Sequence, residues 1–327
     1  MDDGRVTQAL TSFLDLNPEL SDFREEVLKG LSRKQKSVPC KFFYDERGSE
    51  IFDRICELDE YYPTRTEIGI LEERVGEIAE LIGRNAHLIE LGSGASVKIR
   101  TLLDALPDLA QYTAVDISRD FLLNSTETLA LDYPHISVAA ICADYTREFR
   151  VPAPTGRENL RRVGFFPGST IGNFTPNGAV EFLRRIAQIL GAGGGLLIGA
   201  DLKKDADILY AAYNDARGLT AKFNFNLLER ANVELGADFD TGAFRHDAPY
   251  LEGPGKIEMR LYSERDQSVK IGRHSFDFRA GEYIHTENSY KYTIGEFRKL
   301  CGKAGFTPVA SWTDDRNLFC VHYFSVD

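Results

Sequence analysis

The sequence predicts an α/β fold: a doubly wound, mostly parallel sheet with helices on both faces, together with a second, mixed α+β domain. Three observations support this prediction. Short apolar segments alternate with amphipathic helical segments through the middle of the chain. A glycine-rich turn, Gly92–Gly94, directly follows the first apolar segment. A long stretch, Leu202–Lys291, then interrupts the alternation before it resumes near the C-terminus. Short apolar strands separated by helices are typical of parallel sheets that are covered on both faces.

The alternation begins with a helix. Thr64 and Glu67 have the spacing of a capping box, and apolar side chains then recur every three or four residues as far as Ile78. Another amphipathic helix is expected over Gly178–Leu190. The expected parallel strands, each short and apolar, are His87–Leu91, Tyr112–Ile117, Ser137–Ala143, Arg162–Phe166 and Gly195–Ala200.

The C-terminal end of the chain predicts a helix followed by a pair of strands. The helix covers Thr293–Ala304, and the strands are Thr307–Trp312 and Leu318–Val326, separated by the polar turn Thr313–Asn317. A sheet that finishes in this way, with one strand antiparallel, differs from most dinucleotide-binding sheets.

The first 66 residues and the stretch Leu202–Lys291 do not follow the alternation. A crossover between parallel strands needs only about a dozen residues and its helix. Lys256–Ser263 has alternating apolar residues, and Val269–Tyr290 contains further extended segments. We therefore expect a sheet domain of residues 67–202 and 292–327, and a second domain of residues 1–66 and 203–291. The second domain is expected to lie over the carboxyl ends of the parallel strands, where open α/β sheets bind ligands.

Composition excludes several classes of partner. The net charge of −11 argues against a nucleic-acid partner, because nucleic-acid binders usually carry a basic surface. No apolar run approaches the ~20 residues of a membrane span, and the N-terminal sequence MDDGRVTQAL does not have the pattern of a signal peptide. The five cysteines form no C-x-x-C pair, and no histidine has metal-site spacing to another His or Cys with further ligands nearby. We expect a cytoplasmic monomer with reduced thiols and no metal.

The segment Glu90–Lys98 follows a strand and opens a helix, so its glycines allow a ligand to approach the backbone closely. The third glycine of a dinucleotide fingerprint is replaced by Val97, which disfavours a nicotinamide or flavin enzyme. Asp116 ends the second strand, where a carboxylate would bind ribose hydroxyls. Asp144 ends the third strand beside Tyr145, where the acid would accept from an adenine amino group while the ring packs nearby. Each acid alone could be a strand-end cap or a solvated carboxylate, but the three features together favour an adenosine-containing cofactor.

Longer motifs run through nearly the whole chain in a fixed order. They are Lys41–Glu67, Glu90–Lys98, Phe166–Phe174, Ala212–Asn224, Ala237–Asp240, Lys256–Met259 and Thr286–Tyr292. Together these motifs resemble the histidine Nα-methyltransferase family of ergothioneine biosynthesis, whose members convert histidine to hercynine (trimethylhistidine) in three steps. The resemblance implies a Rossmann-like class I methyltransferase sheet, the cofactor S-adenosylmethionine and the small-molecule substrate L-histidine.

The resemblance also implies the site residues. The S-adenosylmethionine site is expected to contain Tyr44, Gly92, Ser93, Lys98, Asp116, Asp144 and Tyr145. The acceptor pocket is expected to contain Phe52, Tyr61, Gly168, Thr170, Asn173, Tyr213, Met259, Glu287 and Ser289. Asn173 and Tyr213 match the family residues that hold the substrate carboxylate, and Glu287 and Ser289 match those that hold the imidazole. Tyr44 and Asn173 are the expected catalytic residues.

The chemistry of methyl transfer is compatible with these residues. Transfer from a sulfonium to an amine is an in-line displacement, and much of its catalysis can come from positioning. Glu287 and Ser289 lie two residues apart on an expected strand, so they share a face and can meet the two nitrogens of an imidazole. From the residues alone, Glu287 and Ser289 could also be solvated edge residues, and Met259 a core residue. Two other functions remain open: methylation of another amino acid such as tryptophan, and a non-catalytic protein that binds S-adenosylmethionine or an amino acid.

Overall fold

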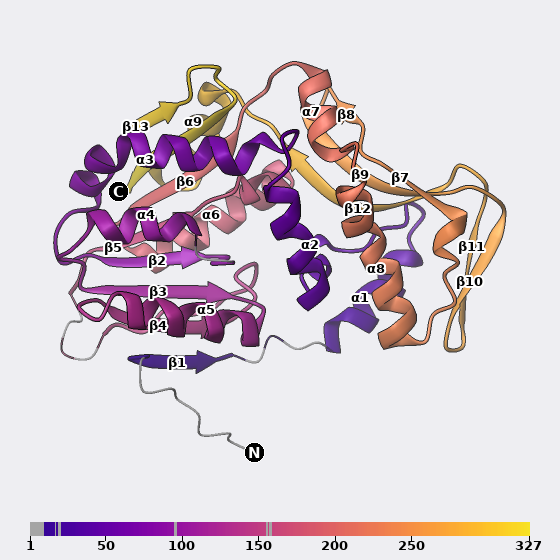
Figure 1. Cartoon of the computed structure of the whole chain (residues 1–327), viewed down its shortest axis with the longest axis horizontal. Coiled ribbons are helices and arrows are strands. Elements are labelled where there is room, and N and C mark those ends of the chain that lie inside the picture. The colour runs from indigo at the N-terminus through magenta and orange to yellow at the C-terminus, as the bar shows by residue number, and fades with distance from the viewer. Residues whose placement is uncertain (1–9, 17, 19–20, 95–96, 155, 157–158) are drawn as a thin grey trace. The chain divides into compact units, whose positions relative to one another are not determined.

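The computed structural model describes residues 10–327 except 17, 19–20, 95–96, 155 and 157–158. The expectation about a signal peptide therefore lies largely outside the described residues. The chain forms two compact units, each built from segments that are far apart in the sequence (Figure 1). The first unit comprises Met1–Pro18, Pro63–Leu202 and Tyr292–Asp327, and the second comprises Glu19–Tyr62 and Lys203–Lys291.

The first unit contains an eight-stranded sheet in the order β1-β4-β3-β2-β5-β6-β14-β13. Its strands are β1 (Ser12–Asp15), β2 (His87–Leu91), β3 (Gln111–Asp116), β4 (Ser137–Cys142), β5 (Arg162–Phe166), β6 (Gly195–Asp201), β13 (Phe306–Thr313) and β14 (Phe319–Val326). The strands β1 to β6 run parallel to one another, whereas β14 is antiparallel to both β6 and β13. The predicted α/β class with a mixed sheet of the class I methyltransferase type is therefore confirmed.

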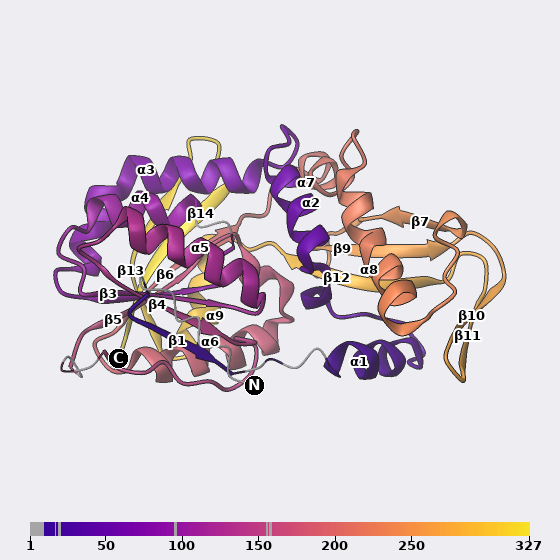
Figure 2. The ribbon, with the colours of Figure 1, turned by 60° about the horizontal axis from the view of Figure 1, so that its bottom comes forward.

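Helices cover both faces of this sheet (Figure 2). They are α3 (Tyr62–Ile82), α4 (Val97–Ala105), α5 (Arg119–Asp132), α6 (Pro176–Leu190) and α9 (Ile294–Gly302). Apolar side chains of α3, α4 and α5 share one core with the central strands, and α6 packs beside α9 on the other face. Local signals start α6, where Pro176 occupies the first turn and the Thr175 hydroxyl accepts from the Gly178 N–H.

Two expectations about the N-terminal part of the chain were wrong. Residues 1–66 were assigned to the second domain, but β1 (Ser12–Asp15) pairs with β4 and extends the sheet of the first unit. Thr64 and Glu67 do not form a capping box, because α3 begins at Tyr62 and both residues lie inside the helix. A capping box occurs instead at the start of α9, between Thr293 and Glu296.

The second unit combines helices with a smaller antiparallel sheet. Its helical elements are α1 (Ser21–Leu31), η1 (Cys40–Phe43), α2 (Glu46–Cys56), α7 (Ala206–Tyr213), α8 (Leu219–Leu235) and η3 (Thr241–Ala243). Its strands are β7 (Phe244–Asp247), β8 (Tyr250–Leu251), β9 (Lys256–Ser263), β10 (Gln267–Ile271), β11 (His274–Phe278) and β12 (Tyr283–Tyr290). The sheet order is β12-β9-β7 with β8 also paired to β9, and β10-β11 is a separate hairpin. Helix α8 packs against α2 and this sheet. Within the described part of the chain, none of the helices has the length and apolarity that a membrane crossing requires.

Candidate functional site

The glycine turn after β2 meets the end of β3 in the first unit. Gly92 and Gly94 both have positive φ, +73° and +47°, which glycine adopts without steric cost. The Gly94 N–H donates to Oδ2 of Asp116 at 3.3 Å. Residues 95–96 of the same motif lie outside the described residues. The structure therefore brings the turn and the Asp116 carboxylate together, as the adjacent strand ends predict.

Asp116 is held by backbone donors at the edge of the sheet. In addition to Gly94, the Ser118 N–H donates to its Oδ1 at 2.9 Å. Burial raises the pKa of Asp116 above its ordinary value, and these N–H groups act in the opposite direction. A carboxylate only accepts, so its free lone pairs suit the hydroxyl donors of a ribose.

Asp144 and Tyr145 follow β4 at the same edge. Asp144 Oδ1 accepts from the Thr146 N–H at 3.0 Å and from the Thr146 hydroxyl at 2.5 Å. The Tyr145 ring packs edge-on against Phe166, with the ring centroids 5.7 Å apart. It also lies against the glycine turn, since a Cβ at Gly92 would be 3.4 Å from a ring carbon of Tyr145. An aromatic ring and a carboxylate thus stand next to the turn.

A buried ion pair links three further segments of the first unit. Lys98 Nζ donates to Oε2 of Glu67 at 2.5 Å, and the two Glu67 oxygens accept from the Gly168 N–H at 3.1 and 2.8 Å. Glu67 is fully buried. It approaches β6 so closely that a Cβ at Gly199 would lie 2.1 Å from its Oε1. Two predicted site residues, Lys98 and Gly168, are therefore held by Glu67, whose spacing from Thr64 predicts only a helix cap.

The loop after β5 carries the predicted residues Gly168, Thr170 and Asn173. Gly168 has φ +79°, and Ser169 has φ +55°, a left-handed conformation that costs energy for a residue with a Cβ. The Ser169 hydroxyl accepts from the Asp201 N–H at 2.8 Å, which ties the loop to the end of β6. Thr170–Asn173 then forms a short 3-10 helix, η2. A strained backbone held in this way is common at ligand sites.

Aromatic side chains predicted for the site gather in the second unit. The Tyr44 and Phe52 rings lie 5.5 Å apart, and both pack on Phe223 of α8. Tyr61 stands edge-on to Phe52 and to Tyr213, at 6.2 Å in each case. Burial, followed by the neighbouring Tyr213, raises the pKa of Tyr61 well above its ordinary value, so its hydroxyl keeps its proton. These aromatic rings form an apolar surface, and three of them, Tyr44, Tyr61 and Tyr213, also carry hydroxyl groups.

A β-bulge sets the direction of Glu287 in the same unit. In β12, Glu287 pairs with Met259 and Ser289 pairs with Ile257, both on β9. The register shifts just before Glu287, leaving Thr286 as an extra residue whose hydroxyl donates to the Met259 carbonyl at 3.1 Å. A one-residue bulge moves the following side chains to the other face of a strand. Glu287 and Ser289 consequently share the buried face of Met259.

Glu287 is a buried acid that shares a strand face with Ser289 and feels the charge of Lys291. Burial raises the pKa of Glu287 to about 7, and Lys291 opposes this effect. The Ser289 and Tyr213 hydroxyl oxygens are 2.8 Å apart, and Lys291 Nζ donates to both. Lys291 lies within the motif Thr286–Tyr292, two positions after Ser289, but the sequence gives it no role of its own.

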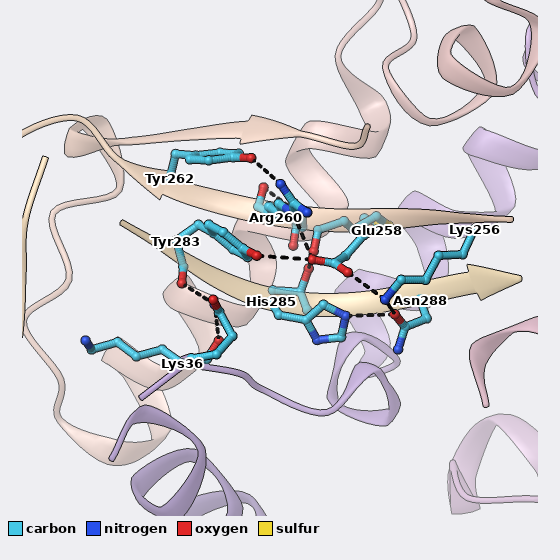
Figure 3. Close-up of polar contacts among 12 residues, drawn as sticks. Lys36, Lys256, Glu258, Arg260, Tyr262, Tyr283, His285 and Asn288 are labelled. Carbon is cyan, nitrogen blue, oxygen red and sulfur yellow. Dashed lines mark hydrogen bonds and ion pairs between the residues drawn. The ribbon is translucent and has the colours of Figure 1, made fainter. Parts of the chain in front are cut away.

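The opposite face of β9 and β12 carries a separate network of charges (Figure 3). Glu258 forms ion pairs with Lys256 at 2.6 Å and with Arg260 at 2.9 Å. The Asn288 side-chain oxygen accepts from Lys256 at 2.6 Å and lies 3.2 Å from His285 Nε2. These contacts join the two strands on the face opposite to Met259, Glu287 and Ser289.

The structure thus places the predicted residues in two groups. Those of the first unit are Gly92, Ser93, Lys98, Asp116, Asp144, Tyr145, Gly168, Thr170 and Asn173, and those of the second unit are Tyr44, Phe52, Tyr61, Tyr213, Met259, Glu287 and Ser289. Among the residues that the structure describes, no group of three or more His, Cys, Asp or Glu side chains is arranged to hold a metal ion.

Comparison with known proteins gives a consistent result. The family model of histidine-specific, S-adenosylmethionine-dependent methyltransferases matches residues 23–326. The histidine N-alpha-methyltransferase of Mycolicibacterium smegmatis is 40% identical over 319 residues, which cover 96% of this chain and 98% of that protein. Its namesake from Mycobacterium tuberculosis is also 40% identical, over 90% of this chain and 92% of its own length. The ergothioneine biosynthesis protein 1 of Neurospora crassa is 33% identical over 85% of this chain, which corresponds to 32% of that longer protein.

Proposed function

Because the chain belongs to the family of histidine-specific, S-adenosylmethionine-dependent methyltransferases, we propose that it methylates the α-amino nitrogen of L-histidine. Up to three successive transfers would give hercynine, the first step of ergothioneine biosynthesis, in line with the names of its relatives. The observation that most supports histidine is the buried Glu287 carboxyl group beside the Ser289 hydroxyl on the Met259 face of the small sheet.

The residues at the edge of the large sheet fit S-adenosylmethionine, which supplies an electrophilic methyl group on a sulfonium cation. Asp116 would accept from the ribose hydroxyls, and Asp144 from the adenine amino group beside the Tyr145 ring. Glu90 lies within the electrostatic reach of Glu67, Lys98 and Asp116. Burial raises the pKa of Glu90 to about 8, so this acid is largely neutral near pH 7. The balance therefore rests on the two acids Glu67 and Asp116 against the single ammonium of Lys98, and it favours a cation. We assign Gly92, Ser93, Lys98 and Tyr44 to the same cofactor.

Recognition of the acceptor follows from the hydrogen-bonding groups of a neutral imidazole, which has one N–H donor and one bare nitrogen acceptor. The ionised Glu287 carboxylate would accept from the ring N–H, and the Ser289 hydroxyl would donate to the other nitrogen. Asn173 and Tyr213 would hold the substrate carboxylate. The remaining residues of the pocket, which shape its walls, would be Phe52, Tyr61, Gly168, Thr170 and Met259.

Catalysis in this proposal consists of orientation. The acceptor must present a neutral amine with its lone pair in line with the methyl carbon, and correct orientation alone can lower the barrier by up to ~7–11 kcal/mol. Tyr44 would contact the amine, and Asn173 would fix the carboxylate next to it. Each transfer turns the amine into an ammonium, which must lose a proton before the next transfer.

The cellular setting is part of the same proposal. All five cysteines are free thiols, which suits the reducing cytoplasm. We expect a monomer that binds small molecules and neither nucleic acid nor membranes, in keeping with the net charge of −11. Size-exclusion chromatography with light scattering checks the oligomeric state.

Mass spectrometry tests the reaction directly. The enzyme is incubated with S-adenosylmethionine and an equimolar mixture of the twenty amino acids. We expect histidine alone to gain one, two and then three methyl groups. A product from another amino acid, or no product from any of them, would refute the proposed function. Asp116→Ala serves as the control without cofactor binding.

A further inference from the structure

Lys291 is a buried lysine for which the proposed reaction has no assigned role. It follows β12 directly, and it is only 2% exposed. Burying an ammonium is costly unless hydrogen bonds or opposite charges compensate for the lost water. Its Nζ donates to the Tyr213 hydroxyl at 3.0 Å and to the Ser289 hydroxyl at 2.8 Å, and it lies 4.8 Å from the centroid of the Tyr213 ring.

The three groups form a closed triangle, because the two hydroxyl oxygens are themselves 2.8 Å apart. An ammonium only donates, so both oxygens act as acceptors toward Lys291. The bond between Tyr213 and Ser289 uses one of the two hydroxyl hydrogens. The other hydroxyl hydrogen must therefore point out of the triangle. Because Lys291 occupies an acceptor position on both oxygens, the hydroxyl hydrogens are left to point elsewhere. When the substrate binds, the bond between Tyr213 and Ser289 would give way, so that Ser289 donates to the imidazole and Tyr213 to the substrate carboxylate.

Lys291 also affects the charge of Glu287. The ionisable groups that act on or are affected by Glu287 are Lys291 after β12, Cys40 in η1 and Tyr61 before α3. Burial raises the pKa of the Cys40 thiol to about 12 and the pKa of Tyr61 well above its ordinary value, so both stay neutral near pH 7. Lys291 is the cation among these groups, and it is the influence that lowers the pKa of Glu287.

We propose that Lys291 is a positioning residue of the acceptor pocket: its ammonium orients the Tyr213 and Ser289 hydroxyls and balances the buried Glu287 carboxylate. This inference rests on the proposed function, since it concerns how the same pocket recognises a neutral imidazole. The arrangement presents one acceptor, one donor and a nearby positive charge. It therefore admits an uncharged ring and rejects cationic side chains such as those of lysine and arginine.

The test compares Lys291→Met with Lys256→Met. Methionine keeps the length of the side chain and removes the charge and the donors. Lys256 is a matched control because its side chain is 15% exposed and lies on the opposite face of the same sheet, paired with Glu258, which keeps Arg260 as a partner (Figure 3). Folding is checked by circular dichroism, cofactor affinity by calorimetry, and kcat and KM for histidine are measured from pH 6 to 9.

We expect Lys291→Met to raise KM for histidine by about 10- to 100-fold, as the loss of charge-assisted hydrogen bonds implies. Its affinity for S-adenosylmethionine should stay within about twofold of the parent. Because Glu287 loses the cation that lowers its pKa, the acid limb of kcat/KM should also move to higher pH. Lys256→Met should show neither change. The inference would be overturned if folded Lys291→Met kept the KM and the pH profile of the parent. It would also be overturned if kcat/KM for histidine fell by the same factor at every pH.

One further comparison keeps the test decisive. If Lys291→Met does not fold, Glu287→Gln is compared with Glu287→Gln/Lys291→Met, in which both buried charges are gone. A higher KM for histidine in the double variant supports the orientation of the hydroxyls, and an equal KM refutes it. Failure of the parent to methylate histidine would instead refute the proposed function, so the two failures are distinguishable.

Discussion

Replacing Glu67 with glutamine should weaken cofactor binding, although no contact between Glu67 and the cofactor is proposed. Glutamine keeps the volume of the side chain and an oxygen that can accept from the Gly168 N–H. It loses the negative charge that holds Lys98 Nζ at 2.5 Å. The uncompensated ammonium then stands at the edge of the sheet where we place the sulfonium cation, and it no longer has a fixed position.

The size of the free-energy loss in Glu67→Gln follows from the exposure of the Glu67 and Lys98 side chains. Removing one member of a fully buried ion pair costs about 3–5 kcal/mol. The Glu67 side chain is 1% exposed but that of Lys98 is 17% exposed, so water can partly solvate the released ammonium. We therefore expect a smaller loss of about 1.5–3 kcal/mol, typical of a hydrogen bond to a charged group. If the loss falls on cofactor binding, it corresponds to roughly a 10- to 150-fold weaker Kd.

Calorimetric titration with S-adenosylmethionine measures this effect. Glu77→Gln is the control, because Glu77 lies on the same helix, its side chain is 58% exposed, and it bonds Trp312 and Arg74 away from the glycine turn. Gly199→Ala should weaken cofactor binding in the same way, because its Cβ would displace the Glu67 carboxylate. A folded Glu67→Gln protein that binds the cofactor within twofold of the parent would refute the reasoning.

Three other outcomes test the assigned residues. Asp116→Ala should abolish S-adenosylmethionine binding and leave the fold intact, because several hydrogen bonds to a buried carboxylate are lost at about 1.5–3 kcal/mol each; unchanged affinity in calorimetry would contradict the assignment. The kcat/KM for histidine should rise from pH 6 to about 9, since two groups become reactive by losing a proton: Glu287, whose pKa is about 7, and the substrate amine, whose pKa is about 8 in peptides and higher in a free amino acid. A flat profile would show that neither group controls kcat/KM in this pH range. Glu287→Ala should cost histidine on the order of 2–4 kcal/mol in kcat/KM and cost phenylalanine and tryptophan little; equal proportional losses for the three would mean that Glu287 supports the scaffold and does not read the ring.

The sheet was predictable because its strands are apolar on both faces and short. His87–Leu91 and Arg162–Phe166 begin and end where the sequence analysis placed them. The edge strand β1 was missed because Ser12–Asp15 is half exposed and has no apolar run of its own. Its conformation depends on pairing with β4, which is far away in the sequence. Local periodicity therefore finds buried strands and misses strands that exist only through a partner.

The candidate site was predictable where topology alone brings residues together. Asp116 and Asp144 end neighbouring parallel strands, so their proximity to the glycine turn follows from the strand order. The direction of Glu287 was not fully predictable in this way. The sequence suggests that Glu287 and Ser289 share a face, but which face they take depends on the bulge at Thr286, and the bulge depends on pairing with β9.

Glu67 and Lys291 were missed for a common physical reason. A buried charge looks like a solvated one in the sequence, because its compensation comes from partners on other elements. Lys98 is 31 residues from Glu67, and Tyr213 is 78 residues from Lys291. The sequence nevertheless contains a signal for Glu67, namely the glycine Gly199 within the otherwise apolar strand β6. Glycine in the middle of a strand is unfavourable unless another group needs the space. Gly199 in the centre of β6 meets that condition, because any side chain there would occupy the position of the Glu67 carboxylate.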